Sequence, residues 1–269
     1  MYVLYYVLGA MAIYLLFWKV IPLVRKAKKI TKGLLSSIYL NKNATENQEQ
    51  YRKIAIGALY SEQQTAYINS LKTGLAKSDI KKLLSKWWDI SNTIQAKDTL
   101  NYLQEKGFRY YFNVVLKAYD ETDNKEQEHI ILSGFDQNSQ TYEEDTQKAY
   151  QQLIHLQETW QELLQNNIIS TKEELLRYGN IGWDCGRLVF LSRLCFDVGY
   201  ISENEAWDYI NRAYELATQN FDTWEEFSKS YVIGRGMWGG KGCYNETIMN
   251  IAQELLKNPK SPWVQLNFK

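Results

Sequence analysis

The first 24 residues differ from the rest of the chain in their pattern of apolar and polar positions. Residues 2–18 carry no charged side chain, Lys19 follows, and a further apolar run ends at Val24. Roughly 20 apolar residues in a helix, at about 1.5 Å each, span the hydrocarbon core of a bilayer. The pattern therefore predicts a transmembrane anchor over residues 1–24.

Two other interpretations of this segment predict different flanking residues. A cleaved signal peptide has positive charge before its apolar run and a small-x-small cleavage site after it. Here Trp18, Lys19 and Pro22 stand where that site would be. A core helix of the domain is the second alternative. The flanks favour an uncleaved anchor, because Lys19 can extend to the interface and Trp18 suits headgroup depth.

A cluster of basic residues follows the apolar run directly. It consists of Arg25, Lys26, Lys28, Lys29 and Lys32. Basic residues beside a membrane span stay in the cytoplasm, and they attract anionic lipid headgroups. We therefore expect a single-pass protein of the inner (cytoplasmic) membrane, with its C-terminal domain in the cytoplasm and anionic lipid bound by the cluster.

The remainder of the chain has the pattern of a helical domain. Prolines occur only at positions 22, 259 and 262, and apolar residues recur at helical spacing between them. The predicted fold class is all-α, an N-terminal single transmembrane helix followed by a globular multi-helix domain. The predicted divisions are a transmembrane anchor at 1–24, a basic juxtamembrane segment and polar linker at 25–50, an α-helical domain at 51–258 and a C-terminal tail at 259–269.

Capping residues and apolar stripes place the individual helices. Predicted helices run from near Tyr51 toward Tyr67, from a Ser78 cap through Ile80, Leu83, Leu84 and Trp87, from Ser91 or Asn92 to Gly107, and from a Ser170 or Thr171 cap. A long helix carries Tyr150, Leu153, Leu156, Trp160 and Leu163 on one stripe, and a buried helix runs from about Trp183 to Val198, where Gly199 ends it. Ser202 with Glu205, and Thr223 with Glu226, form capping boxes. Residues 120–146 read as two loops around a short apolar piece at 130–132.

Composition excludes several classes of function. Acidic and basic residues balance at 31 each, so the chain without its basic juxtamembrane cluster is mildly acidic, which argues against a nucleic-acid partner. The three cysteines show no paired spacing, and Cys185 and Cys195 fall in one apolar helix as small core residues. The two histidines, His129 and His155, stand alone, and His155 falls off the apolar stripe. Neither a zinc site nor a histidine-based triad is predicted, and no cofactor is.

Two charged pairs lie in the predicted 183–198 helix. At 100° per residue, Asp184 and Arg187 share the apolar stripe with Leu191 and Leu194, whereas Arg193 and Asp197 lie on another flank. A charge that faces a core must be paired and hydrogen-bonded. The first pair either ties the helix start to a neighbouring helix or forms the polar floor of a pocket. The second is expected to be a surface or interhelix pair.

Residues 231–243, YVIGRGMWGGKGC, contain five glycines with Arg235 and Lys241. Such a segment can form a backbone nest for an anion. It does not match a phosphate-binding Walker loop, because Arg235 stands where the first glycine is needed and Gly242 where Ser or Thr is needed. The favoured interpretation is a helix C-terminus that unwinds into a loop, with Trp224 and Trp238 as core and lid residues.

Two blocks of sequence resemble a known family. One spans Gly57 to Asn113 and contains Leu71-Lys72-Thr73-Gly74 and Trp87-Trp88-Asp89-Ile90. The other contains Gly182-Trp183-Asp184-Cys185-Gly186-Arg187, Glu205-Ala206-Trp207, Trp224-Glu225-Glu226-Phe227 and Gly234-Arg235. The chain is thereby similar to the bacterial domain of unknown function 1266 family. The resemblance implies an α-helical domain, and it singles out Trp183, Asp184, Arg187, Trp207, Trp224 and Arg235 as a candidate binding or structural cluster.

Two functions from different classes remain open. The first is a membrane-anchored cytoplasmic interaction module with a protein partner, favoured by the predicted anchor, the aromatic-rich helices and the lack of a catalytic constellation. The second is an enzyme or small anionic-ligand binder that uses an Asp184/Arg187/Arg235 pocket. A pocket that joins these three residues favours the second function, and a dry, filled core around them favours the first.

Overall fold

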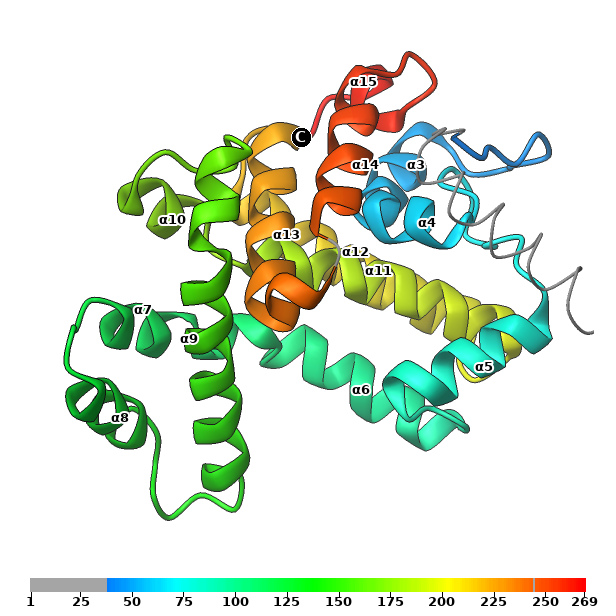
Figure 1. The fold of residues 1–269 in the computed structure, drawn as a ribbon. Coiled ribbons are helices and arrows are strands. Elements are labelled where there is room, and N and C mark those ends of the chain that lie inside the picture. Colours follow the sequence, from blue (N-terminus) through cyan, green and yellow to red (C-terminus); the bar gives the residue numbers. More distant parts are fainter. Residues whose placement is uncertain (1–37, 244) are drawn as a thin grey trace, which may run out of the picture. The chain divides into compact units, whose positions relative to one another are not determined.

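A helix that is buried on all sides, α11 (Ile181–Val198), lies at the centre of the domain. The computed structural model describes residues 38–243 and 245–269, and contacts group Ile38–Lys269 into one compact unit (Figure 1). The described residues form helices and turns without a strand, so the predicted all-α class is confirmed.

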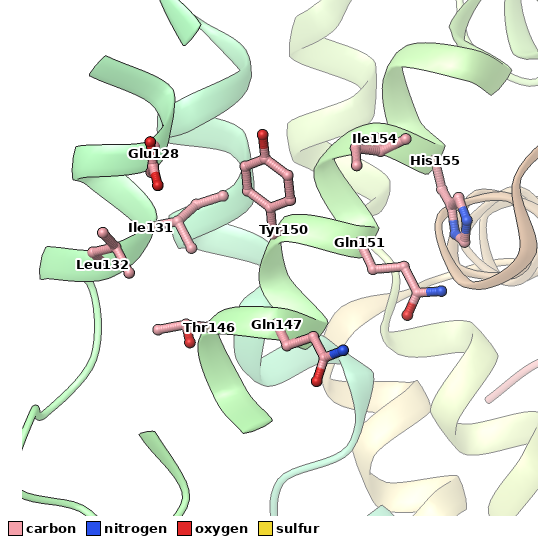
Figure 2. Close-up of a pocket in the computed structure, with 9 residues that line it drawn as sticks. All are labelled: Glu128, Ile131, Leu132, Thr146, Gln147, Tyr150, Gln151, Ile154 and His155. Atoms are coloured by element: carbon pink, nitrogen blue, oxygen red, sulfur yellow. The ribbon is translucent and has the colours of Figure 1, made fainter. Parts of the chain in front are cut away.

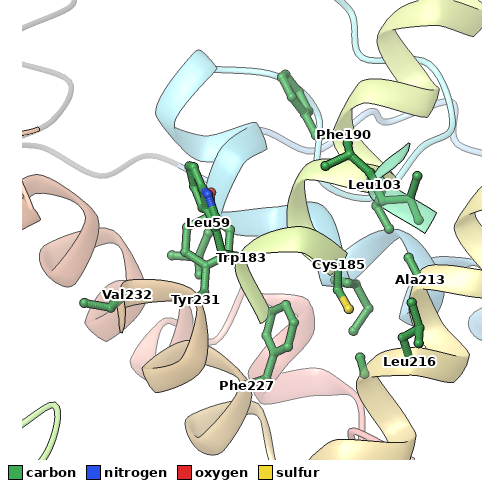
Figure 3. Close-up of a cluster of buried hydrophobic side chains, with 14 of the residues drawn as sticks. Leu59, Leu103, Trp183, Cys185, Phe190, Ala213, Leu216, Phe227, Tyr231 and Val232 are labelled. Atoms are coloured by element: carbon green, nitrogen blue, oxygen red, sulfur yellow. The ribbon is translucent and has the colours of Figure 1, made fainter. Parts of the chain in front are cut away.

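The described part of the chain forms further helices before and after α11. They are α3 (Gln48–Ile54), η2 (Ala55–Gly57), α4 (Ala58–Gln64), α5 (Lys77–Trp88), α6 (Thr93–Glu105), η3 (Phe108–Tyr111), α7 (Phe112–Tyr119), α8 (Asn124–Ser133), α9 (Tyr142–Gln165), α10 (Lys172–Tyr178), α12 (Glu203–Asn220), α13 (Trp224–Gly239), η4 (Gly240–Cys243), α14 (Asn245–Lys257) and α15 (Pro262–Gln265). Helices α12, α13, α6, α4 and α5 all contact α11, which explains why residues 182–195 are buried without interruption. Figure 3 shows part of the resulting core around Trp183 and Cys185.

Glycines let α11 and α13 approach each other closely. A Cβ atom added at Gly182 would lie 2.8 Å from the backbone nitrogen of Tyr231, and one at Gly186 2.5 Å from the Tyr231 ring. On the facing helix, a Cβ atom at Gly234 would overlap the side chain of Trp183. The glycines therefore set the distance between the helices that carry Trp183 and Arg235.

Most predicted helix ends are confirmed. Helix α11 ends at Gly199 in the left-handed conformation, Asn92 caps α6, and Thr171 caps α10. Ser202 and Glu205 form the predicted capping box. Thr223 caps α13 by accepting from the Glu226 N–H, but the Glu226 carboxylate accepts from Asp222 rather than from the cap, so the second box is incomplete.

Other predicted elements are wrong in detail. Ser78 is not a cap, because α5 begins at Lys77 after Ala76. Residues 120–146 contain a full helix, α8, because the Asp123 side chain caps it by accepting from the Lys125 N–H. Tyr150 lies off the buried stripe of α9 with an exposed fraction of 43%. The glycine-rich segment does not unwind early, since α13 continues through Gly239 before η4.

The C-terminal residues pack into the domain through aromatic contacts. The rings of Trp224 and Trp263 stack with centroids 5.2 Å apart, and Phe268 lies edge-on to Trp224 at 4.8 Å. The Trp224 indole N–H donates to the Leu266 carbonyl at 2.8 Å. Trp224 therefore fixes the tail that follows α14.

None of the helices in residues 38–243 and 245–269 combines the length and the apolar character needed to cross a membrane. The predicted anchor at residues 1–24 and the basic cluster at 25–32 lie outside the described residues.

Candidate functional site

Asp184, the carboxylate of the candidate cluster, is buried and accepts several hydrogen bonds. It is 1% exposed, and Oδ1 accepts from the Phe108 N–H at 3.0 Å. Oδ2 accepts from the Arg109 N–H at 2.9 Å and from Arg109 Nη1 at 3.2 Å. Arg187 Nη2 donates to Oδ1, so the predicted i, i+3 pair forms. Asp184 thus ties α11 to η3, as the first of the two interpretations of this pair predicts.

Gly107 makes this arrangement possible. Its φ of +59° lies in the left-handed region, where glycine carries no steric penalty. A Cβ atom there would also overlap Asp184 Oδ2. The residue predicted to end the preceding helix therefore also leaves the space that the carboxylate occupies.

Arg187 lies among aromatic rings. It is 5% exposed, and its guanidinium carbon lies 4.8 Å from the ring centroid of Trp183, 5.1 Å from that of Phe108 and 5.7 Å from that of Trp88. Cations at such distances are attracted by the negative ring faces, and more strongly when water is excluded. Asp184 on one side and the rings on the other fix the guanidinium in place.

A small cavity joins Arg187 to Arg235. Its volume is about 80 Å³, and its lining residues come from α4, α5, α11 and α13. They are Tyr60, Trp87, Trp88, Trp183, Arg187, Arg235 and Trp238. Arg235 is 8% exposed, and its guanidinium carbon lies 5.6 Å from the Trp183 ring and 6.0 Å from the Trp238 ring. We call this the arginine cavity.

The charged side chains that line the arginine cavity are basic. Its described lining residues include two guanidiniums and no carboxylate, and Asp184 behind it serves both Arg109 and Arg187. Burial raises the pKa of Tyr60, only partly opposed by the Trp88 indole and the charges of Arg187 and Arg235. The Tyr60 phenol therefore stays neutral and adds no negative charge.

Buried donors of the lining residues include the indole N–H of Trp183 and the Nε–H of Arg187. Neither has an acceptor within the described part of the chain. An unsatisfied buried donor costs about 1–3 kcal/mol, so such groups need an explanation. They mark the surroundings of the arginine cavity as a region short of hydrogen-bond acceptors.

The structure separates the six predicted candidates. Trp183, Arg187 and Arg235 meet at the arginine cavity, and Asp184 holds Arg187 from behind. Trp224 lies instead in the aromatic cluster of the tail, and Trp207 packs half-buried on α12. Trp238, predicted as a lid residue, lines the cavity.

Sequence reasoning did not select Tyr60 or Arg109. The residues around Tyr60 carry no pattern typical of a binding site. Arg109 lies 75 positions before Asp184, so helical spacing could not show that the two residues meet. The Trp87-Trp88 pair was the available signal for α5, because two adjacent indoles cannot both face the core of one amphipathic helix.

The second charged pair was predicted wrongly. Arg193 is fully buried and donates to the Leu71 carbonyl at 3.2 Å, to Ser61 Oγ at 2.8 Å and to the Tyr67 carbonyl at 2.5 Å. Burial lowers its pKa to about 10, opposed by Asp197 and Glu46. Asp197 accepts instead from the Thr73 N–H at 2.9 Å. Both residues hold the loop between α4 and α5, because Arg193 donates to two of its carbonyls and Asp197 accepts from its Thr73 N–H.

No three His, Cys, Asp or Glu side chains gather in a metal-binding arrangement within the described residues. Comparison with curated proteins and with solved structures returns no match. A family model does match residues 83–268. This range includes Asp184, Arg187 and Arg235, and it begins within α5 at Leu83. The chain therefore belongs to the family described as "Protein of unknown function (DUF1266)".

Proposed function

We propose that the domain binds a small ligand through an anionic group, a phosphate or a carboxylate, in the arginine cavity. The observation that carries the proposal is the meeting of the Arg187 and Arg235 guanidiniums in one small cavity lined by aromatic rings. Guanidiniums are the preferred side chains for phosphate and carboxylate because their planar forks match those oxygens. An anion there accepts hydrogen bonds from buried donors of the lining residues, such as the Nε–H of Arg187.

The size of the cavity limits what enters it. A water molecule occupies about 30 Å³ of liquid, and drug-sized pockets hold about 300–1,000 Å³. At about 80 Å³, the arginine cavity suits one phosphate or carboxylate group rather than a whole cofactor. Trp87 lines it and is 63% exposed, so the rest of the ligand has an aromatic surface to pack against at the outside.

Binding rather than catalysis is the function that the geometry favours. A general base needs a lone pair free for the substrate proton. The Asp184 carboxylate already accepts four hydrogen bonds, from Phe108, from Arg109 twice and from Arg187. Its role is to position Arg187, which contacts the ligand.

The location of the domain rests on the sequence. We propose that residues 2–24 anchor it in the inner membrane, with Arg25, Lys26, Lys28 and Lys29 at anionic headgroups and the C-terminal domain in the cytoplasm. The protein should then stay in the pellet after a carbonate wash. Protease added to inverted vesicles should digest the domain, and protection of the domain there would refute this orientation.

Ligand binding is tested by tryptophan fluorescence of the full-length protein in detergent, titrated with inorganic phosphate, phenyl phosphate or benzoate. Four of the lining residues are tryptophans, so filling the cavity should change the emission. We expect saturable binding, tighter for phenyl phosphate than for phosphate because of Trp87. Arg235→Gln should weaken it at least tenfold, since a hydrogen bond to a charged group contributes about 1.5–3 kcal/mol.

The matched control is Arg212→Gln, which removes a guanidinium from a side chain that is 42% exposed on α12. It should bind all three probes like the wild type. Absence of saturable binding to every probe, or equal affinity in the Arg235→Gln protein, would exclude an anion site in the arginine cavity.

A further inference from the structure

A second surface of the domain carries apolar side chains that the fold leaves uncovered. Helices α8 and α9 enclose a groove of about 580 Å³, which we call the α8–α9 groove (Figure 2). Leu132 of α8 and Tyr150 and Ile154 of α9 line it with exposed fractions of 41%, 43% and 40%. Single exposed apolar residues are ordinary, but several that share one concave surface mark an interaction site.

The groove is held open by contacts at both of its ends. The Tyr142 hydroxyl donates to the Leu132 carbonyl at 2.9 Å, where α8 ends and α9 begins. At the opposite end, Gln157 Nε2 donates to Gln127 Oε1 at 3.5 Å. Helix α7 packs against both helices from behind, and Ile131, which is 2% exposed, forms the floor. The two helices are therefore fixed at a separation that their own side chains do not fill.

The charged side chain in the described lining of the groove is acidic. Its described lining residues include the Glu128 carboxylate and neither lysine nor arginine. Spacing on α9 places the exposed Glu143 one turn before the lining positions 146 and 147. Lys148 pairs with Glu144 and Lys106 with Asp145, whereas Lys125 lies exposed on α8 one turn before Glu128. A partner that brings a positive charge next to its apolar residues complements Glu128.

The shape of the groove selects a helix as the occupant. Lining residues of α9 run from Thr146 to His155, which at 1.5 Å per residue is roughly 15 Å, or nearly three helical turns. A β-strand would need free backbone donors and acceptors along the groove, whereas the walls are helices with internally paired backbones. A small molecule would leave most of this open apolar surface in contact with water.

We propose that the α8–α9 groove binds an amphipathic helix of a partner protein. Large apolar side chains at i, i+3 or i+4 and i+7 would contact Leu132, Tyr150 and Ile154, and a lysine or arginine on the flank would pair with Glu128. This binding uses none of the residues of the arginine cavity, so it stands or falls independently of the anion site.

Site-specific photo-crosslinking of the full-length protein in the cells that produce it tests the proposal. A benzophenone amino acid replaces Leu132 in one protein and Leu176 in the control, because Leu176 is 55% exposed on α10, away from the groove. Mass spectrometry then identifies the peptide joined to position 132. We expect a segment with helical apolar spacing and flanking basic residues, absent from the Leu176 sample.

Charge reversal makes the test specific to the groove. Glu128→Lys should reduce the adduct at least fivefold, whereas Glu203→Lys, an exposed charge on α12, should leave it unchanged. An acidic or non-helical cross-linked segment, an adduct with a second copy of this chain, an equal yield from Leu176, or no adduct at all would each overturn the proposal.

Discussion

Asp184 and Arg187 form an ion pair one turn apart on α11, with side-chain exposed fractions of 1% and 6%. The same carboxylate accepts two backbone N–H groups and one guanidinium from the start of η3. A single buried side chain therefore joins the central helix, a distant turn and one wall of the arginine cavity.

Asp184→Ala should destabilise the domain strongly. Removing one partner of a buried ion pair costs about 3–5 kcal/mol, because the other charge stays buried without compensation. Typical domains have about 5–15 kcal/mol of unfolding free energy in total. Urea unfolding followed by helical circular dichroism should show a markedly lower midpoint.

The control is Asp208→Ala, which removes an exposed carboxylate from α12. Substitutions on the surface usually change stability by less than about 0.5 kcal/mol. Equal midpoints for the two variants would mean that Asp184 acts in ligand binding alone and that its hydrogen bonds contribute little to folding.

Arg193→Met should release the loop between α4 and α5. The substitution keeps an apolar stem of similar length but removes all three hydrogen bonds, leaving the carbonyls of Leu71 and Tyr67 without this donor. Each buried unsatisfied group costs about 1–3 kcal/mol. We expect a lower unfolding midpoint and faster proteolysis within residues 65–76, measured by mass spectrometry of the first cleavage products.

Asp197→Ala should reproduce the same proteolysis to a smaller degree, because Asp197 contacts this loop at one residue, Thr73, whereas Arg193 donates to two of its carbonyls. An unchanged cleavage pattern in both variants would show that the loop is held by its other contacts.

The sequence predicted local features of α11 correctly. Its extent follows from apolar residues that recur at helical spacing, its end from Gly199, and the Asp184–Arg187 pair from spacing within one turn. Each of these features depends on residues that are close together in the chain, where helical geometry alone determines which side chains can contact each other.

Features that depend on distant residues were not predictable in the same way. Arg193 is buried because its carbonyl acceptors come from a loop more than 120 positions earlier in the chain. The helical spacing within α11 cannot predict contacts with that loop. The arginine cavity forms because α13 approaches α11 closely. The glycines that allow this approach could be recognised as contact residues only from the packed structure. Helix α8 was missed because it buries only Gln127 and Ile131, which gives a weak apolar stripe.

Gly234→Ala should separate α13 from α11 and weaken anion binding. The added methyl would overlap Trp183, and overpacking a close contact typically costs about 1–3 kcal/mol. Because Arg235 adjoins this position, the two guanidiniums should move apart and affinity for phenyl phosphate should fall. Gly242→Ala is the control, since nothing lies within 4 Å of a Cβ there. Matching affinities in both proteins would contradict a role for the glycine in shaping the cavity.

Asp145 should make the stability of the domain sensitive to acid. Burial would raise its pKa, but hydrogen bonds from Lys106, Tyr111 and Thr141 outweigh burial and hold that pKa below the usual 3.8. A carboxyl with a lowered folded pKa stabilises the fold above its unfolded pKa, and this contribution is lost as the pH falls through the folded value. Asp145→Asn should therefore lower the unfolding free energy at pH 7. At pH 3, the difference in unfolding free energy between wild type and variant should be smaller.

The control is Asp136→Asn, at an exposed position. Its unfolding free energy, measured by urea unfolding, should equal that of the wild type at both pH values. A gap between Asp145→Asn and wild type that stays constant from pH 7 to pH 3 would show that the carboxylate is not selectively stabilised in the folded state.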